Sequence, residues 1–83
     1  MAVRFHTHAL ERMKERCASK KEVLATVEKG EQFTAKFDRT GFRRNFSKDF
    51  VWRGKKYKNK QIEAYCVKEN KDWTVITVIT KYY

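Results

Sequence analysis

The sequence predicts an α+β fold, with two N-terminal helices packed on a three- to four-stranded antiparallel sheet. Apolar residues recur at helical spacing before Gly30 and alternate with polar residues after it. The segment Trp73–Thr80 is rich in β-branched residues, as a buried strand requires. At 83 residues the chain suits one domain, residues 1–83, with a single modest core.

Thr7 is the predicted N-cap of a first helix over His8–Cys17. Leu10, Met13 and Cys17 follow at i, i+3 and i+7, and so form a narrow apolar stripe that faces a core.

A second helix is predicted to begin at Lys20, because Ser19 and Glu22 have the spacing of a capping box. Gly30 stands where a C-terminal cap glycine belongs. This helix has the pattern of a structural element, and we assign it no chemistry.

Three or four strands are expected after Gly30. The first ends near Arg39 and is followed by a Thr40-Gly41 turn. Phe42–Trp52 fits a helix or a strand, because its phenylalanines repeat every four residues, and we favour the strand. Gly54 then interrupts the chain. The last two strands are predicted to form a hairpin, Lys60–Lys68 with Trp73–Lys81.

The positive charge is concentrated in residues 36–60, which hold ten basic and two acidic residues and six of the twelve aromatic residues. Cations neutralise phosphates and rings stack on bases, so this composition favours contact with RNA, with DNA as the alternative. The alternative is a solvated basic face over ordinary core aromatics. The predicted nucleic-acid-binding residues are Arg16, Arg43, Arg44, Trp52, Lys55, Lys56, Tyr57 and Lys58.

His8, Arg12 and Arg16 form a second stripe on the first helix, at i, i+4 and i+8. An imidazole and two guanidinium groups in a row could hold a phosphate. The alternative is that the arginines pair with Glu11 or Glu15 on a solvated helix.

Metal-independent RNA cleavage needs a base for the 2′-OH, an acid for the leaving oxygen and cations on the phosphorane. The candidate catalytic residues, if folding brings them together, are His8, Arg12, Lys60, Thr77 and Tyr82.

Other chemistries have weaker signals. His6 and His8 are the one metal-like pair, without clustered carboxylates or thiols, so we predict no metal site. The three glycines are isolated and form no phosphate loop, and no cofactor is expected. Cys17 and Cys66 are expected to be buried thiols.

No apolar run is long enough for a membrane span, and Met1–His8 lacks a signal-peptide core, so we expect a cytoplasmic protein without membrane contact.

Several stretches together resemble a small bacterial and phage-associated domain family of unassigned function. His8–Arg16 has the pattern H-A-x-x-R-M-x-x-R, and Ser19–Glu31 is similar to the helix that follows it. Trp52–Ile62 resembles a W-x-G-K-x-Y-x-x-K-x-v block, and Val75–Val78 resembles a closing V-v-T-V strand. Cys17-Ala18 departs from the Gly-Ile often found at that helix end.

The resembled family is grouped by fold with the barnase, EndoU, colicin and RelE-like ribonucleases. The resemblance implies helices packed on an antiparallel sheet, His8 as acid/base and Arg12 as phosphate ligand, with Lys60 and Thr77 from the sheet. We therefore expect a toxin-like, metal-independent endoribonuclease, with an antitoxin or other acidic protein as a possible partner. The alternatives are a non-catalytic nucleic-acid-binding module and a small basic protein-interaction or inhibitor domain.

Overall fold

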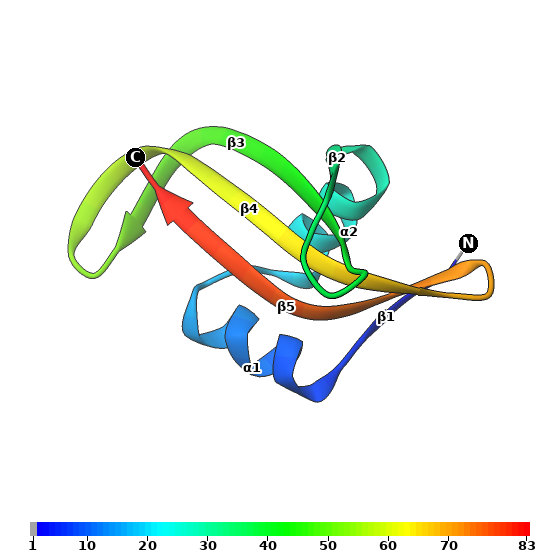
Figure 1. The fold of residues 1–83 in the computed structure, drawn as a ribbon. Helices are drawn as coiled ribbons and strands as arrows, with labels where there is room; N and C mark the ends of the chain where they lie inside the picture. Colours follow the sequence, from blue (N-terminus) through cyan, green and yellow to red (C-terminus); the bar gives the residue numbers. More distant parts are fainter. Residues whose placement is uncertain (1) are drawn as a thin grey trace.

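The chain folds into two helices and a five-stranded sheet, and the computed structural model describes residues 2–83. Figure 1 shows the elements in chain order. They are β1 (Val3–Phe5), α1 (Thr7–Glu15), α2 (Lys20–Lys29), β2 (Glu31–Thr34), β3 (Thr40–Trp52), β4 (Lys55–Glu69) and β5 (Asp72–Tyr82). The α+β class is confirmed.

The sheet has the strand order β1-β5-β4-β3-β2. The pairs from β2 to β5 are antiparallel, but β1 lies parallel to β5, with Val3 opposite Trp73. The expectation of three or four antiparallel strands is therefore corrected to five strands in a mixed sheet. The additional strand is β1, which has only three residues and no alternating pattern of its own.

Helix α1 is bounded differently from its prediction at both ends. The N-cap is His6 instead of Thr7: the His6 Nδ1 atom accepts a hydrogen bond from the backbone N–H of His8 at 3.1 Å. The helix ends at Glu15, and Cys17 has a left-handed φ of 58° that α-helical geometry does not allow. The chain then turns directly into α2.

Helix α2 begins as predicted. Ser19 Oγ accepts from the N–H of Glu22 at 3.1 Å, and Glu22 Oε1 accepts from the N–H of Ser19 at 3.0 Å, which completes the capping box. Gly30 ends the helix with φ −77°, so it does not use the left-handed geometry of a cap glycine. It is needed for space, because a Cβ there would lie 2.7 Å from the carbonyl oxygen of Arg43.

The turn between β2 and β3 lies earlier than predicted. β2 ends at Thr34, and the chain reverses through Phe37 and Asp38, which both have left-handed φ values of 61° and 56°. Thr40 and Gly41 are the first residues of β3, and they pair with Thr34 and Phe33. The predicted strand to Arg39 and the Thr40-Gly41 turn were therefore wrong.

Two long hairpins form the rest of the sheet. The β3–β4 hairpin turns at Arg53-Gly54, which have φ values of 51° and 78°, and the β4–β5 hairpin turns at Asn70-Lys71. Phe42–Trp52 is therefore a strand. A bulge between Ser47 and Phe50 interrupts its pairing with β4. The β3–β4 hairpin extends well past both helices (Figure 1).

Both helices contribute to one core on one face of the sheet. Helix α1 packs on β5, and α2 packs on β3 and β4. The opposite face of β4 and β5 is uncovered by helices, and the side chains of Glu63, Tyr65, Thr77 and Ile79 alternate onto it. The core residues are Ala9, Met13, Ala18, Val23, Val27, Phe42, Ile62, Ala64, Cys66, Trp73, Val75 and Val78.

Neither helix is long and apolar enough to cross a membrane.

Candidate nucleic-acid interface

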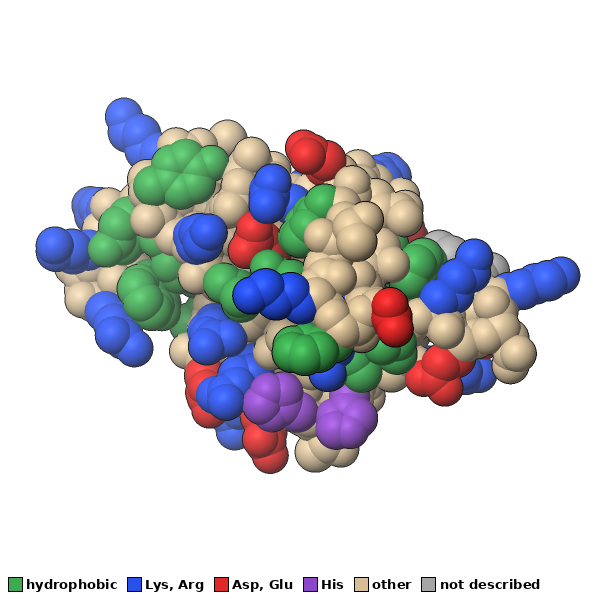
Figure 2. All heavy atoms as spheres, in the orientation of Figure 1, with side chains coloured by type: hydrophobic (Ala, Val, Ile, Leu, Met, Phe, Trp, Pro, Cys, Tyr) green, Lys and Arg blue, Asp and Glu red, His purple; other side chains and the backbone are tan. Residues whose placement is uncertain are grey.

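The distal part of the β3–β4 hairpin, residues 48–58, carries a dense positive charge and is called the basic hairpin below. Its one acidic residue is Asp49, and no cation of the basic hairpin forms an ion pair with any residue from 2 to 83. Figure 2 shows Lys and Arg side chains with hydrophobic ones between them at this end of the molecule. The five cations, all exposed, are Lys48, Arg53, Lys55, Lys56 and Lys58.

Aromatic rings of the basic hairpin gather around Tyr82. The Trp52 ring stacks on Tyr82 with centroids 4.8 Å apart and an interplanar angle of 15°. Tyr57 and Phe50 lie 5.5 Å and 6.3 Å from the same tyrosine ring. The guanidinium of Arg53 lies 4.5 Å from the Trp52 centroid. Trp52 and Tyr57 are half-buried residues.

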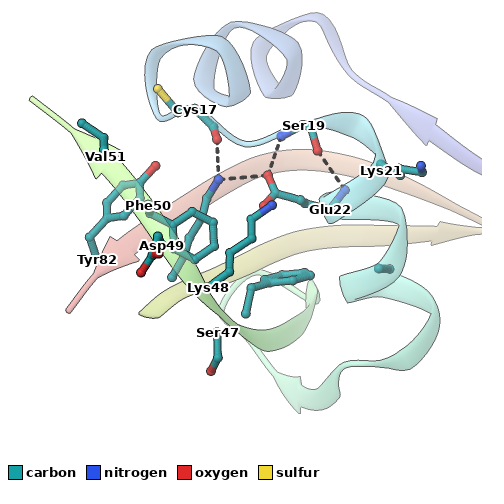
Figure 3. A pocket seen from close by; sticks show the side chains of 13 residues that line it. Cys17, Ser19, Lys21, Glu22, Ser47, Lys48, Asp49, Phe50, Val51 and Tyr82 are labelled. Carbon is teal, nitrogen blue, oxygen red and sulfur yellow. Dashed lines mark hydrogen bonds and ion pairs between the residues drawn. The ribbon is translucent and has the colours of Figure 1, made fainter. Parts of the chain in front are cut away.

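Lys60 is not part of this exposed surface. Its side chain is buried, and Nζ donates to the Cys17 carbonyl and to Glu22 Oε1, the latter at 2.9 Å. Figure 3 shows the Cys17 carbonyl and the Glu22 carboxylate converging on this ammonium group. Lys60 therefore connects β4 to the turn between the helices.

The carboxylate of Glu22 is adapted to this pairing. Burial by itself raises the pKa of Glu22, but hydrogen bonds from Ser19 and Lys60 and the charge of Lys60 outweigh burial. The net effect is a pKa below the ordinary value of a glutamate. The Glu22 carboxylate is therefore ionised at neutral pH.

Tyr82 also contacts the turn between the helices. Its hydroxyl donates to the carbonyl of Arg16 at 3.1 Å, and its ring lies 5.7 Å from Lys60 Nζ. Burial is the main reason that the pKa of Tyr82 is raised. Lys60 and Tyr82 are therefore in contact with each other. The Lys60 ammonium group and the Tyr82 hydroxyl both form hydrogen bonds to other residues of the protein.

Lys60 and Tyr82 both line a groove, together with Cys17 and Glu22. It has a volume of about 750 Å³ and lies between the helix turn and the bulge of β3. Lys48 and Lys21 stand on its borders, with Phe46 and Phe50 among its apolar lining.

His8 and Arg12 form a separate group on the outer side of α1. Arg12 Nε donates to His8 Nε2 at 3.4 Å, and Arg12 also pairs with Glu15 at 2.9 Å. The two histidines lie near acidic and basic side chains at the lower edge of the molecule in Figure 2. Arg16, the third residue of the predicted stripe, instead donates to the carbonyl of Val78 at 2.6 Å.

Thr77 lies on the uncovered face of the sheet. It pairs with Tyr65, whereas Lys60 pairs with Tyr82, and strand alternation directs these two pairs to opposite faces. The five candidate catalytic residues therefore occupy three places: His8 with Arg12, Lys60 with Tyr82, and Thr77 alone.

The predicted binding residues also divide. Trp52, Tyr57 and the three lysines between residues 55 and 58 are together on the basic hairpin. Arg44 lies 5.5 Å from the Phe46 ring, outside the basic hairpin. Arg43 lies on the uncovered face, where it pairs with Glu63.

Glu63 is a buried charged residue that sequence reasoning missed. Its side chain is 6% exposed, with Arg43 Nε at 3.0 Å, Lys81 Nζ at 3.8 Å and the Tyr65 hydroxyl at 3.5 Å. The alternation of β4 assigned Glu63 to a polar face. It did not show that two long cationic side chains from β3 and β5 cover the carboxylate.

No group of three or more His, Cys, Asp or Glu side chains within residues 2–83 has an arrangement that could hold a metal ion. His6 uses one ring nitrogen to cap α1. Cys66 is buried as expected, but Cys17 is exposed, because it occupies the left-handed turn between the helices.

Residues 5–80 match the family described as a domain of unknown function, DUF4258. The chain belongs to the DUF4258 family. Searches of curated proteins and of solved structures gave no match to this DUF4258 domain. The expectation that the chain belongs to a domain family of unassigned function is therefore confirmed.

The DUF4258 match covers every element from α1 to β4 and continues into β5 as far as Thr80. It thus includes His8, Arg12 and the basic hairpin, and it assigns no activity to any of them.

Proposed function

We propose that this DUF4258 domain binds single-stranded RNA through the basic hairpin. The observation that carries the proposal is that all five cations of the basic hairpin are exposed and free of ion pairs within residues 2–83. Such charges attract a polyanion and release its counterions on binding. Trp52 and Tyr57 are partly exposed residues of the same hairpin, and aromatic rings can stack on unpaired bases, which a single strand offers and a duplex does not.

Salt dependence follows from the number of cations. If all five contact phosphates, log K should fall with log salt at a slope of about −3.5, using about −0.7 per phosphate for a single strand. Between 50 and 200 mM salt, that slope weakens binding about 100-fold. A shallower slope indicates fewer phosphate contacts.

The test is fluorescence anisotropy of a labelled single-stranded RNA against two triple variants of equal net charge. The first variant is Lys55→Gln/Lys56→Gln/Lys58→Gln, within the basic hairpin. The control is Lys14→Gln/Lys29→Gln/Lys71→Gln, which removes three exposed lysines elsewhere. The hairpin variant should bind far more weakly and lose about 2 units of salt slope. Equal effects of the two variants would show that only overall charge matters.

A second candidate, the toxin-like metal-independent endoribonuclease, rests on His8 and Arg12. Their side chains are adjacent, at 3.4 Å, on an accessible side of α1, so an imidazole acid/base would stand beside a phosphate ligand. Two N-terminal helices on a largely antiparallel sheet support the grouping with barnase-like and RelE-like ribonucleases. Lys60 and Tyr82 support this candidate less, because their polar groups already bind protein.

Cleavage of a mixed RNA pool in EDTA tests the second candidate, with wild type compared with His8→Ala. Products ending in 2′,3′-cyclic phosphate, absent for the variant, would establish catalysis through His8. If both proteins bind RNA and neither cuts it, the endoribonuclease candidate fails and RNA binding remains as the proposed function. If RNA is neither bound nor cut, an acidic protein such as an antitoxin becomes the partner to seek.

A further inference from the structure

The uncovered face of the sheet has a recess of about 420 Å³ beneath the turn between β2 and β3. This volume is within the range of pockets that bury small organic ligands. Its floor is formed by Tyr65, Thr77 and Ile79, and Phe33 meets Tyr65 edge to face at 5.9 Å. The remaining lining residues are Thr34, at the end of β2, and Ala35, Lys36, Phe37 and Arg39 of the turn.

Phe37 at the rim of the recess is in an unusual state. The residue is 85% exposed, and its φ of 61° is left-handed, which is unfavourable for a bulky side chain. The residue contributes nothing to the core, so the fold gives no reason for an aromatic ring at this place. An exposed ring beside an apolar recess is well placed to stack on a planar ligand.

Positive charge accompanies the ring. Lys36 and Arg39 line the same recess, and neither forms an ion pair within the described part of the chain. Arg43, which pairs with Glu63, also lies next to the recess, with its guanidinium 4.6 Å from the Phe33 centroid. The recess thus combines an apolar floor, a free aromatic ring and cations at the border, the combination that suits a nucleotide.

We propose that the recess receives one nucleobase of bound single-stranded RNA, stacked on Phe37 with its phosphate near Lys36 and Arg39. This inference rests on the proposed RNA binding by the basic hairpin, to which it adds a second contact at the start of β3. The basic hairpin supplies charge, and the recess supplies a shaped site in which bases of different size can be distinguished.

The first test measures RNA affinity for Phe37→Leu and Phe37→Trp by anisotropy. Leucine retains apolar bulk without a ring face, and tryptophan retains stacking, while both keep a non-glycine residue at the same φ. Phe37→Leu should bind about 5- to 100-fold more weakly, the range of a lost base–aromatic stack, and Phe37→Trp should bind at least as well as wild type. If Phe37→Leu binds as tightly as wild type and the hairpin triple variant does not, the recess proposal fails and RNA binding by the hairpin stands.

The second test does not depend on the basic hairpin. Adenosine 5′-monophosphate is titrated into the ¹⁵N-labelled protein, with inorganic phosphate as the control. Saturable amide shifts at Phe33, Phe37, Tyr65 and Thr77, produced by the nucleotide, absent with phosphate and lost in Phe37→Leu, support the recess. Shifts produced equally by phosphate, or no shifts at these residues, overturn it. The nucleotide titration tests the recess even if the wild type does not bind long RNA. Failure to bind long RNA would instead refute the proposed function of the basic hairpin.

Discussion

Lys60 holds its positive charge inside the protein, with Glu22 and the carbonyl of Cys17 as partners. Breaking a buried ion pair by removing one partner leaves the other charge uncompensated, which typically costs about 3–5 kcal/mol. Lys60→Ala should therefore lower the free energy of unfolding by about that amount, measured by urea denaturation. The control is Lys58→Ala, an exposed lysine two positions away, which should change it by less than about 0.5 kcal/mol. Equal stability of the two variants would contradict a structural role for Lys60.

The same ion pair predicts a loss of stability in acid. The pKa of Glu22 in the folded protein is below its unfolded value, so the unfolded state binds the proton more readily. The stabilisation is fully present above the unfolded pKa and is lost as the pH falls through the lower, folded pKa. Glu22→Gln should be less stable than wild type at pH 7, and the difference should shrink as the pH falls below about 4. A difference that is constant with pH would exclude the ionised pair as its cause.

The two cysteines should react very differently. Burial raises the pKa of Cys66 to about 12, so hardly any thiolate exists at neutral pH, whereas Cys17 is exposed. We expect one thiol to react with DTNB in the native protein at pH 8 and two after denaturation. Cys17→Ser should abolish the native reaction, and Cys66→Ala, the matched variant, should leave it intact.

At the scale of an element, the turn that follows α1 holds a non-glycine residue, Cys17, in an unfavourable backbone conformation. Cys17 has φ 58°, a conformation that costs a non-glycine residue roughly 1–2 kcal/mol, and glycine adopts it freely. Cys17→Gly should raise the free energy of unfolding by up to about 1 kcal/mol, since the greater flexibility of glycine in the unfolded chain offsets part of the gain. The Lys60 contact should survive, because it uses the backbone carbonyl. Cys17→Ala, which keeps the strained φ, is the control and should not stabilise the protein.

Elements with strong local signals were predictable from the sequence. The capping box of Ser19 and Glu22 fixed the start of α2, and the β-branched run fixed β5. The turn after β2 was not predictable from its residue types. Its left-handed residues are Phe37 and Asp38, whereas Gly41, the residue that usually marks such a turn, lies in β3. Phe33 explains that glycine: its ring occupies the space of a side chain at position 41.

At the scale of the whole molecule, long-range pairing limits what sequence reasoning can reach. β1 was missed because its partner, β5, lies about 70 residues away. The clustering of charge in residues 36–60 was visible, since it is a property of neighbours in the chain. The burial of Lys60 and Glu63 was not, because each is covered by residues from distant elements. The separation of Thr77 from Lys60 depends in the same way on the register of the sheet.

The projection of the β3–β4 hairpin beyond the helices has a consequence for solubility. β2 pairs only with the first residues of β3, and the C-terminal strand pairs with β4 only from Asn59 onward, where Asn59 and Tyr83 exchange backbone hydrogen bonds. The outer edges of β3 and β4 are therefore unpaired near the hairpin tip. Unpaired strand edges invite pairing between molecules, and lysines along an edge oppose it by repulsion. We therefore expect the lysines of the basic hairpin to oppose self-association as well. Light scattering should detect more association for the Lys55/Lys56/Lys58 triple variant than for its control of equal net charge, and a concentrated polyanion should have the same effect on the wild type.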